Sequence, residues 1–222
     1  VGSSRGVAIS PAEVCVVPGG KPMIFFPILA IVEPGDEVIL PNPSFPTYAS
    51  AVRFAGGIPI SIPLIEANEF SFDMQRLRDA ITPRTKLLIL NSPANPTGGV
   101  IPPEDIAEIA RLAHQHNFFV FTDEIYSRMW FDAAPRSILS EPGMKDRTIL
   151  LDGFSKTYAM TGWRLGYGVM PAVLIEAMQK LLVNAVSCTA SAVQRAGLAA
   201  LKGDQSPVEH MMEEFRARRT LF

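Results

Sequence analysis

The sequence has few cysteines and no excess of charge of either sign. Its two cysteines, Cys15 and Cys188, are too few for a disulfide framework and lack metal-ligand spacing. We therefore expect no metal site and a reducing, cytoplasmic location. Lysine plus arginine number 20 and aspartate plus glutamate 22, for a formal net charge of −2. This balance argues against a nucleic-acid-binding surface and against a basic patch that binds membranes.

Long apolar runs, internal repeats and low-complexity segments are also missing. The longest apolar stretch, residues 22–32, contains two prolines, is too short to cross a bilayer and has no basic start like that of a signal peptide. We expect a buried helix there. Apolar residues still make up 48% of the 222 residues and charged residues 19%. This composition suits one α/β domain with a substantial core.

Short apolar runs alternate with helical patterns along the chain. Six runs are predicted to be strands: residues 37–40, 58–62, 86–90, 118–122, 148–151 and 165–170. Their unbroken apolar character indicates a sheet that is covered on both faces. Between the strands, residues 103–116 begin with Pro-Glu-Asp, which suits a first helical turn. The sequence therefore predicts a three-layer α/β/α fold with a mostly parallel central sheet, whose ligands bind beyond the carboxyl ends of the strands.

Two motifs are rich in glycine or proline, and each has both a structural and a functional interpretation. Gly19-Gly20-Lys21 precedes the apolar helix. It is either an ordinary turn or an anion site made of backbone N–H groups. Asn95 lies in the segment NSPANPTGG, which two prolines and two glycines make stiff and irregular. That segment is either a structural loop or one that offers Asn95 to a ligand oxygen.

Two further motifs carry charged residues directly after predicted strands. Asp123 ends the most apolar strand, where a carboxylate is either a helix cap or a functional group. Tyr126 would lie near Asp123 if the chain turns helically there. Lys156 follows another strand among small and aromatic residues, with Arg164 close in sequence. Most lysines are solvated surface charges, but this setting suits an amine nucleophile.

Taken together, these segments resemble the class I and II aminotransferases of the fold type I pyridoxal-phosphate enzymes, and especially their bacterial aspartate aminotransferase branch. The matching segments are GGK at 19–21, PGDEVILPNPSFPTY at 34–48, NSPANPTGG at 91–99, TDEIY at 122–126 and GFSKTYAMTGWRLGY at 153–167. They occur in the family's order and extend over practically the whole chain. The resemblance implies pyridoxal 5′-phosphate as cofactor and transfer of an amino group from an L-amino acid to a 2-oxo acid.

The resemblance also implies roles for the catalytic residues. Lys156 matches the lysine that forms a Schiff base with the cofactor and then moves the α-proton of the substrate. Asp123 matches the carboxylate that keeps the pyridine nitrogen protonated, so that the ring accepts electrons. Tyr126 and Asn95 match the two groups hydrogen-bonded to the phenolic oxygen of the cofactor.

The remaining matches concern the phosphate and the ring. Arg164 matches the arginine that binds the phosphate, assisted by Ser155 and by the backbone N–H groups of Gly20 and Lys21. Phe45 falls where the family stacks an aromatic ring on the pyridine. In the bacterial aspartate branch, a lysine at the place of Lys21 also approaches the distal carboxylate of acidic substrates. This favours aspartate or glutamate as a substrate, and the alternative is that Lys21 contributes only its N–H group.

The resemblance implies that residues 1–222 are the cofactor-binding large domain of a longer, homodimeric parent. The family's N-terminal arm, which supplies a partner tyrosine, has no counterpart in this sequence. The same is true of the C-terminal small domain, whose arginine binds the α-carboxylate of the substrate. The predicted helix at 207–219 carries Met211, Met212 and Phe215 on one side and ends in arginines, as if another domain followed.

Three functions stay open on the sequence. The first is an aminotransferase that uses amino acid and 2-oxo acid substrates. The second is another fold type I enzyme, such as a lyase or decarboxylase, because these enzymes share the cofactor chemistry. The third is a truncated or sensory cofactor-binding domain without turnover. A DNA-binding regulator is disfavoured because the sequence has no helix-turn-helix segment and no basic surface.

Overall fold

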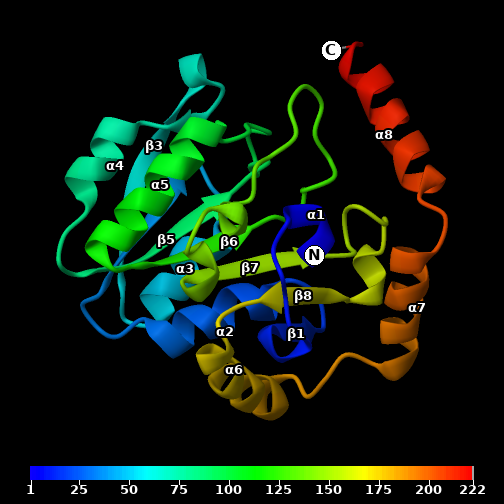
Figure 1. Cartoon of the computed structure of the whole chain (residues 1–222), viewed down its shortest axis with the longest axis horizontal. Coiled ribbons are helices and arrows are strands. Elements are labelled where there is room, and N and C mark those ends of the chain that lie inside the picture. Colours follow the sequence, from blue (N-terminus) through cyan, green and yellow to red (C-terminus); the bar gives the residue numbers. More distant parts are fainter. Residues whose placement is uncertain (222) are drawn as a thin grey trace.

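The computed structural model describes residues 1–221, and its centre is an eight-stranded sheet in the order β1-β8-β7-β6-β5-β2-β3-β4 (Figure 1). The strands are β1 (Val14–Val17), β2 (Glu37–Asn42), β3 (Ile58–Ile65), β4 (Ser71–Phe72), β5 (Thr85–Asn91), β6 (Phe119–Asp123), β7 (Thr148–Gly153) and β8 (Gly166–Val169). The five strands β7, β6, β5, β2 and β3 are parallel to one another. Strand β8 is antiparallel to both of its neighbours, and β4 is antiparallel to β3. The predicted, mostly parallel sheet is confirmed.

Helices cover both faces of this sheet. The α-helices of the described residues are α1 (Gly2–Arg5), α2 (Lys21–Ile31), α3 (Thr47–Phe54), α4 (Met74–Ala80), α5 (Pro103–His116), α6 (Ala172–Ala185), α7 (Ser191–Lys202) and α8 (Ser206–Arg219). In Figure 1, α2 and α6 lie below the sheet, and α4 and α5 lie above it. Helices α7 and α8 continue along one side, and α8 (red) extends away from the rest of the fold. The three-layer α/β/α arrangement agrees with the prediction.

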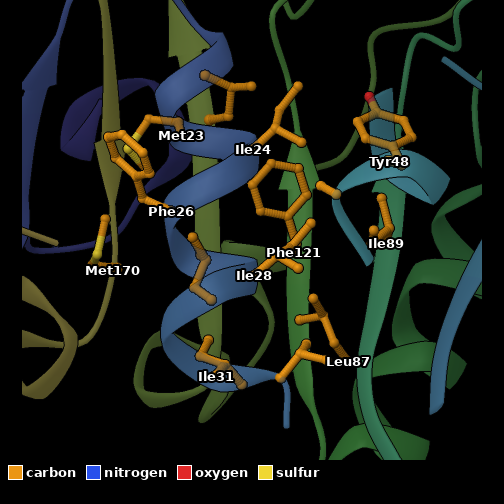
Figure 2. Close-up of a cluster of buried hydrophobic side chains, with 14 of the residues drawn as sticks. Met23, Ile24, Phe26, Ile28, Ile31, Tyr48, Leu87, Ile89, Phe121 and Met170 are labelled. Carbon is orange, nitrogen blue, oxygen red and sulfur yellow. The ribbon is translucent and has the colours of Figure 1, made fainter. Parts of the chain in front are cut away.

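Successive residues of the central strands contribute to two different cores. In β5, Leu87 and Ile89 pack into the core around α2, whereas Leu88 and Leu90 pack into the core around α5. Figure 2 shows the first of these cores, where side chains of α2 meet those of β5 and β6. Because each face needs its own apolar side chains, the middle of β5 (residues 87–90) is apolar without a break, and this is the pattern from which the sheet was predicted.

The differences between prediction and structure lie at the edges of the sheet. All six predicted strands are present, but the last is shortened to β8 and is antiparallel to its neighbours. Strands β1 and β4, each four residues or fewer, were not predicted as strands. On α8, Met212 is buried as expected, whereas Phe215 is 39% exposed, so the expected apolar face of this helix is only partly covered.

Two properties of residues 1–221 bear on function. No helix in this part of the chain is long enough and apolar enough to span a membrane. The same residues contain no group of three or more histidine, cysteine, aspartate or glutamate side chains placed to hold a metal ion. Both Cys15 and Cys188 are free thiols, the first buried and the second exposed.

Candidate active site

A pocket of about 240 Å³ lies where the parallel strands β5 and β6 end. All nine residues predicted from the sequence line it: Gly20, Lys21, Phe45, Asn95, Asp123, Tyr126, Ser155, Lys156 and Arg164. They come from five segments spread between residues 20 and 164. The carboxyl ends of parallel strands meet at one edge of a sheet, which explains why segments far apart in sequence share this cavity.

Asp123 is the last residue of β6 and is 5% exposed. Its Oδ1 accepts a hydrogen bond from the backbone N–H of Ile125 at 3.1 Å, and its Oδ2 accepts one from the hydroxyl of Tyr48 at 2.7 Å. Burial raises the pKa of Asp123 to about 6, while the two hydrogen bonds favour the ionised form. One oxygen of Asp123 therefore stabilises the following turn, while the carboxyl group lines the pocket.

Asn91, at the end of β5, ties the loop after β5 to the end of β6. Its side-chain amide donates to the backbone carbonyls of Asp123 at 3.0 Å and Pro93 at 3.2 Å. Its side-chain oxygen accepts from the backbone N–H of Asn95 at 2.7 Å. Asn91 is buried, so these bonds are shielded from water. They set the position of Asn95 relative to Asp123.

Lys156 and Tyr126 lie next to each other in the pocket. Both side chains are half-buried, and Nζ of Lys156 lies 5.6 Å from the centre of the Tyr126 ring. Lys156 sits in the turn that follows β7, which the bond from the backbone N–H of Ala159 to the Lys156 carbonyl helps to close at 3.0 Å. The amine is thus held by a structured turn and faces an aromatic ring and the pocket.

A second group of residues forms an anion site at the start of α2. Gly19 has a φ of +82°, and a Cβ atom there would overlap the Arg164 guanidinium, so the guanidinium lies directly against this glycine. Arg164 is held there by a bond from its Nη1 to the carbonyl of Thr161 at 2.7 Å. No side chain caps the first turn of α2, and because Pro22 has no N–H and the Met23 N–H bonds to the Gly20 carbonyl, the N–H groups left for a ligand are those of Gly20 and Lys21. A helix N-terminus beside a guanidinium suits a phosphate.

Phe45 and Tyr48 complete the pocket from the loop after β2 and from α3. Their rings pack edge to face with centres 5.8 Å apart. Phe45 is half-buried and lines the cavity, which leaves it available to a planar ligand.

Tyr48 and Asn91 were part of the segments that carry the resemblance, but the sequence analysis assigned them no role. Their partners are far away in the chain: the Tyr48 hydroxyl reaches Asp123, which is 75 residues later. The local sequence around either residue does not identify such a partner.

The whole chain, residues 1–222, matches the sequence model of the family described as "Aminotransferase class I and II". The chain belongs to this family. Pyridoxal 5′-phosphate is the cofactor of class I and II aminotransferases. The chain spans about half the length of the curated relatives it matches.

The proteins similar to this chain include some named aspartate aminotransferase and others named aromatic aminotransferase. The aspartate aminotransferase of Musicola paradisiaca is 40% identical over 208 residues, which are 93% of this chain and 52% of that protein. The aromatic aminotransferase from Pyrococcus horikoshii matches in structure with a TM-score of 0.96 and 39% identity, over 99% of this chain and 60% of that one. A mutant of Thermus thermophilus aspartate aminotransferase has a TM-score of 0.95 and 37% identity, over 99% and 58% of the two chains.

The chemistry of the pocket fits the cofactor of the family. The Arg164 guanidinium lies directly against Gly19, where a Cβ atom would overlap it, and so stands beside the start of α2, which suits a phosphate group. Asp123 is a buried carboxylate, which suits a cationic ring nitrogen, and Lys156 provides the amine that an aldehyde requires. Donors for a phenolic oxygen are present as Tyr126 and Asn95.

Proposed function

We propose that this chain is the cofactor-binding large domain of a pyridoxal-phosphate-dependent aminotransferase, which moves an amino group from an L-amino acid to a 2-oxo acid. One observation carries the proposal. An amine (Lys156), a buried carboxylate (Asp123) and an anion site (Arg164) line the same pocket of about 240 Å³. These are the three kinds of group that a cofactor with an aldehyde, a ring nitrogen and a phosphate needs.

When bound, the cofactor supplies an electron-accepting ring that stabilises negative charge on the α-carbon of the substrate. Asp123 keeps the ring nitrogen protonated. With a pKa of about 6, its carboxyl group is ionised at neutral pH, and a cation beside it favours the ionised form further. Phe45, which lines the pocket, would pack against the ring.

Lys156 would hold the cofactor through its amine, and once the amino group of the substrate replaces that amine, its free Nζ would act as the general base. Its Nζ takes the proton from the α-carbon of the substrate and returns a proton to complete the transfer. The amine moves only a short distance because it stays on a fixed turn beside Tyr126. Tyr126 and Asn95 donate hydrogen bonds to the phenolic oxygen of the cofactor, and the Asn91 bonds keep Asn95 in place.

Phosphate binding anchors the cofactor at the start of α2. Arg164 supplies the charge, Ser155 a hydroxyl, and Gly20 and Lys21 backbone N–H groups. The Lys21 side chain is exposed at the pocket, where its charge would attract the distal carboxylate of a dicarboxylic substrate. We therefore assign aspartate or glutamate as the amino donor.

The parent protein in this proposal is a cytoplasmic homodimer without nucleic-acid or membrane partners. Two free cysteines and a net charge of −2 agree with this location and set of partners. The apolar side chains of Val16 on β1 and of Leu198 and Leu201 on α7 are 42%, 51% and 54% exposed. Exposed apolar side chains of this kind suit an interface between subunits.

The test is to add pyridoxal phosphate to the purified chain and to a Lys156→Ala variant. We expect a visible absorption band with the native chain only, and borohydride should fix the cofactor to Lys156, as peptide mass spectrometry would show. A Lys202→Ala variant, altered at an exposed lysine outside the pocket, is the control and should keep the band. Fixation on a different lysine would contradict the proposal.

Addition of amino acids to the loaded chain then tests turnover and donor. Loss of the visible band with aspartate or glutamate, but not with phenylalanine, supports the acidic donor and an aminotransferase half-reaction. Loss of the band with phenylalanine alone would contradict the role given to Lys21. A band that persists with all three would indicate a cofactor-binding domain without turnover.

A further inference from the structure

Tyr48 belongs to the hydrophobic core around α2, but its hydroxyl is hydrogen-bonded to Asp123 in the pocket. The residue is 1% exposed, and its ring packs against Phe45 and Phe121 with ring centres 5.8 and 6.3 Å away. In Figure 2 the ring lies at one end of the core with its oxygen pointing away from the labelled apolar side chains. A ring held on two sides leaves its hydroxyl little freedom, so the direction of its hydrogen bond is fixed by packing.

That hydrogen bond holds one of the two oxygens of Asp123. The Tyr48 hydroxyl donates to Oδ2 at 2.7 Å, and the Ile125 N–H donates to Oδ1 at 3.1 Å. Because one donor comes from α3 and the other from the turn after β6, they fix the plane of the carboxylate from two directions. Each oxygen retains a further lone pair, so the group can still accept a bond from a ligand in the pocket.

The surroundings of Asp123 otherwise oppose its charge. Burial is the largest effect and raises its pKa to about 6, and the nearby carboxylates of Asp152 and Glu124 act in the same direction. The hydrogen bonds from Tyr48 and from the Ile125 N–H lower this pKa. Other charged or titratable groups that line the pocket are Lys21, Tyr126, Lys156 and Arg164. Burial and Asp123 raise the pKa of Tyr48 well above its ordinary value, so its hydroxyl remains a donor at neutral pH.

We propose that Tyr48 is a positioning residue, whose hydroxyl keeps the Asp123 carboxylate ionised and oriented toward the ring nitrogen of the cofactor. This inference rests on the role proposed for Asp123. Loss of the hydroxyl therefore leaves a buried, charged oxygen of Asp123 without this donor. Bulk water cannot take the place of the hydroxyl, because the oxygen is buried. The pKa of the Asp123 carboxyl group then rises. The group is therefore neutral over a wider pH range, in which it cannot pair with the ring nitrogen.

The test compares Tyr48→Phe with the native chain, because phenylalanine keeps the ring and removes only the hydroxyl. The first measurement is the titration of the Asp123 carboxyl carbon by ¹³C NMR without cofactor. We expect its midpoint to move upward by about one pH unit, as for a lost hydrogen bond to a charged group. An unchanged midpoint in a folded variant would overturn the inference.

The second measurement is the dissociation constant of pyridoxal phosphate from pH 5 to pH 9. We expect the acidic limb of this profile to move upward in the Tyr48→Phe variant, with binding about twofold weaker at its new midpoint and about tenfold weaker at pH 5. Tyr158→Phe is the matched control, because the Tyr158 hydroxyl bonds to Gln205 outside the pocket, and it should retain the native profile.

An Asp123→Asn variant separates the role of Asp123 from that of Tyr48. Weak binding by this variant, together with a native profile for Tyr48→Phe, would overturn the inference and leave the proposed role of Asp123 standing. Native binding by Asp123→Asn would overturn the role of Asp123 and the purpose of Tyr48 with it. Weak binding by Asp123→Asn and a shifted profile for Tyr48→Phe support both.

Discussion

Asp123 and Glu124 are neighbours in sequence at the end of β6, and both are buried, but their surroundings differ. Glu124 forms an ion pair with Arg5 at 2.7 Å, and the same arginine reaches Asp152 at 2.8 Å. No ion pair within residues 1–221 includes Asp123, and the hydrogen-bond partners of its carboxylate there are a hydroxyl and a backbone N–H. Burial raises the pKa of both carboxyl groups, and the Arg5 charge opposes this effect at Glu124.

The difference separates a charge that is compensated within the described chain from one that is left open to a ligand. Arg5 compensates two carboxylates at the ends of β6 and β7, and this network holds the N-terminal segment on the sheet. Asp123 has no such compensation within the described chain, so its charge is available to a cation that arrives from outside. Perturbed and uncompensated carboxylates of this kind are typical of functional sites. The following predictions test this distinction.

Replacement of Arg5 should have the largest effect on stability. Arg5→Met leaves Glu124 and Asp152 buried without a cation, and removal of one partner of a buried ion pair costs about 3–5 kcal/mol. Urea unfolding at neutral pH measures the loss. The control is Arg218→Met, which breaks an exposed pair with Glu214 and should cost less than about 1 kcal/mol. Similar losses in the two variants would show that the Arg5 network is not structural.

Asp123→Asn should change stability in a pH-dependent way. Because burial raises the pKa of Asp123 from 3.8 to about 6, the folded chain holds a proton that the unfolded chain releases between these values. Native stability therefore falls as pH rises through this window, whereas asparagine does not titrate. Without cofactor, we expect the free energy of unfolding of the variant to rise relative to that of the native chain by up to about 3 kcal/mol between pH 4 and pH 7. A difference that stays constant across this range would contradict the raised pKa.

Asn91→Ala should have the smallest of the three effects. It leaves the Asp123 carbonyl and the Asn95 N–H without their partner, which costs about 1–3 kcal/mol for buried groups. Urea unfolding measures the loss, and cofactor affinity should fall as Asn95 loses its support. Asn184→Ala, which removes an exposed bond to the Lys180 carbonyl, should change stability by less than about 0.5 kcal/mol. An equal effect of the two substitutions would rule out a special role for Asn91.

The sequence predicted the fold well because its apolar pattern is strong. Central strands such as β5 bury both faces, and an unbroken apolar run reports this directly. The direction of β8 was not predictable, because an apolar run looks the same in either orientation. The short strand β1 depends on pairing with β8, far along the chain, and β4 consists of two residues paired with the end of β3 just before it, so neither has an apolar run that composition would identify.

The site residues were predicted through family resemblance rather than through spacing. The chemistry of the sequence does not distinguish Asp123 from Glu124, since they are adjacent acids at the end of the same strand. The two residues differ in their hydrogen-bond partners. Asp123 is bonded to Tyr48, 75 residues earlier, and Glu124 is bonded to Arg5, 119 residues earlier. Such pairings exist only once the order of the strands is set, so they are visible in the structure alone.

The pocket is assembled from five segments between residues 20 and 164, and this has a consequence for how the protein is produced. An unfolded chain brings none of these segments together, so the cofactor can bind only after the sheet is complete. A ligand that binds only the native state shifts the folding equilibrium by mass action, by about 2.7 kcal/mol at a hundred times its dissociation constant. The vitamin supply of the host cell would then influence how much of this protein survives proteolysis, apart from any effect on catalysis.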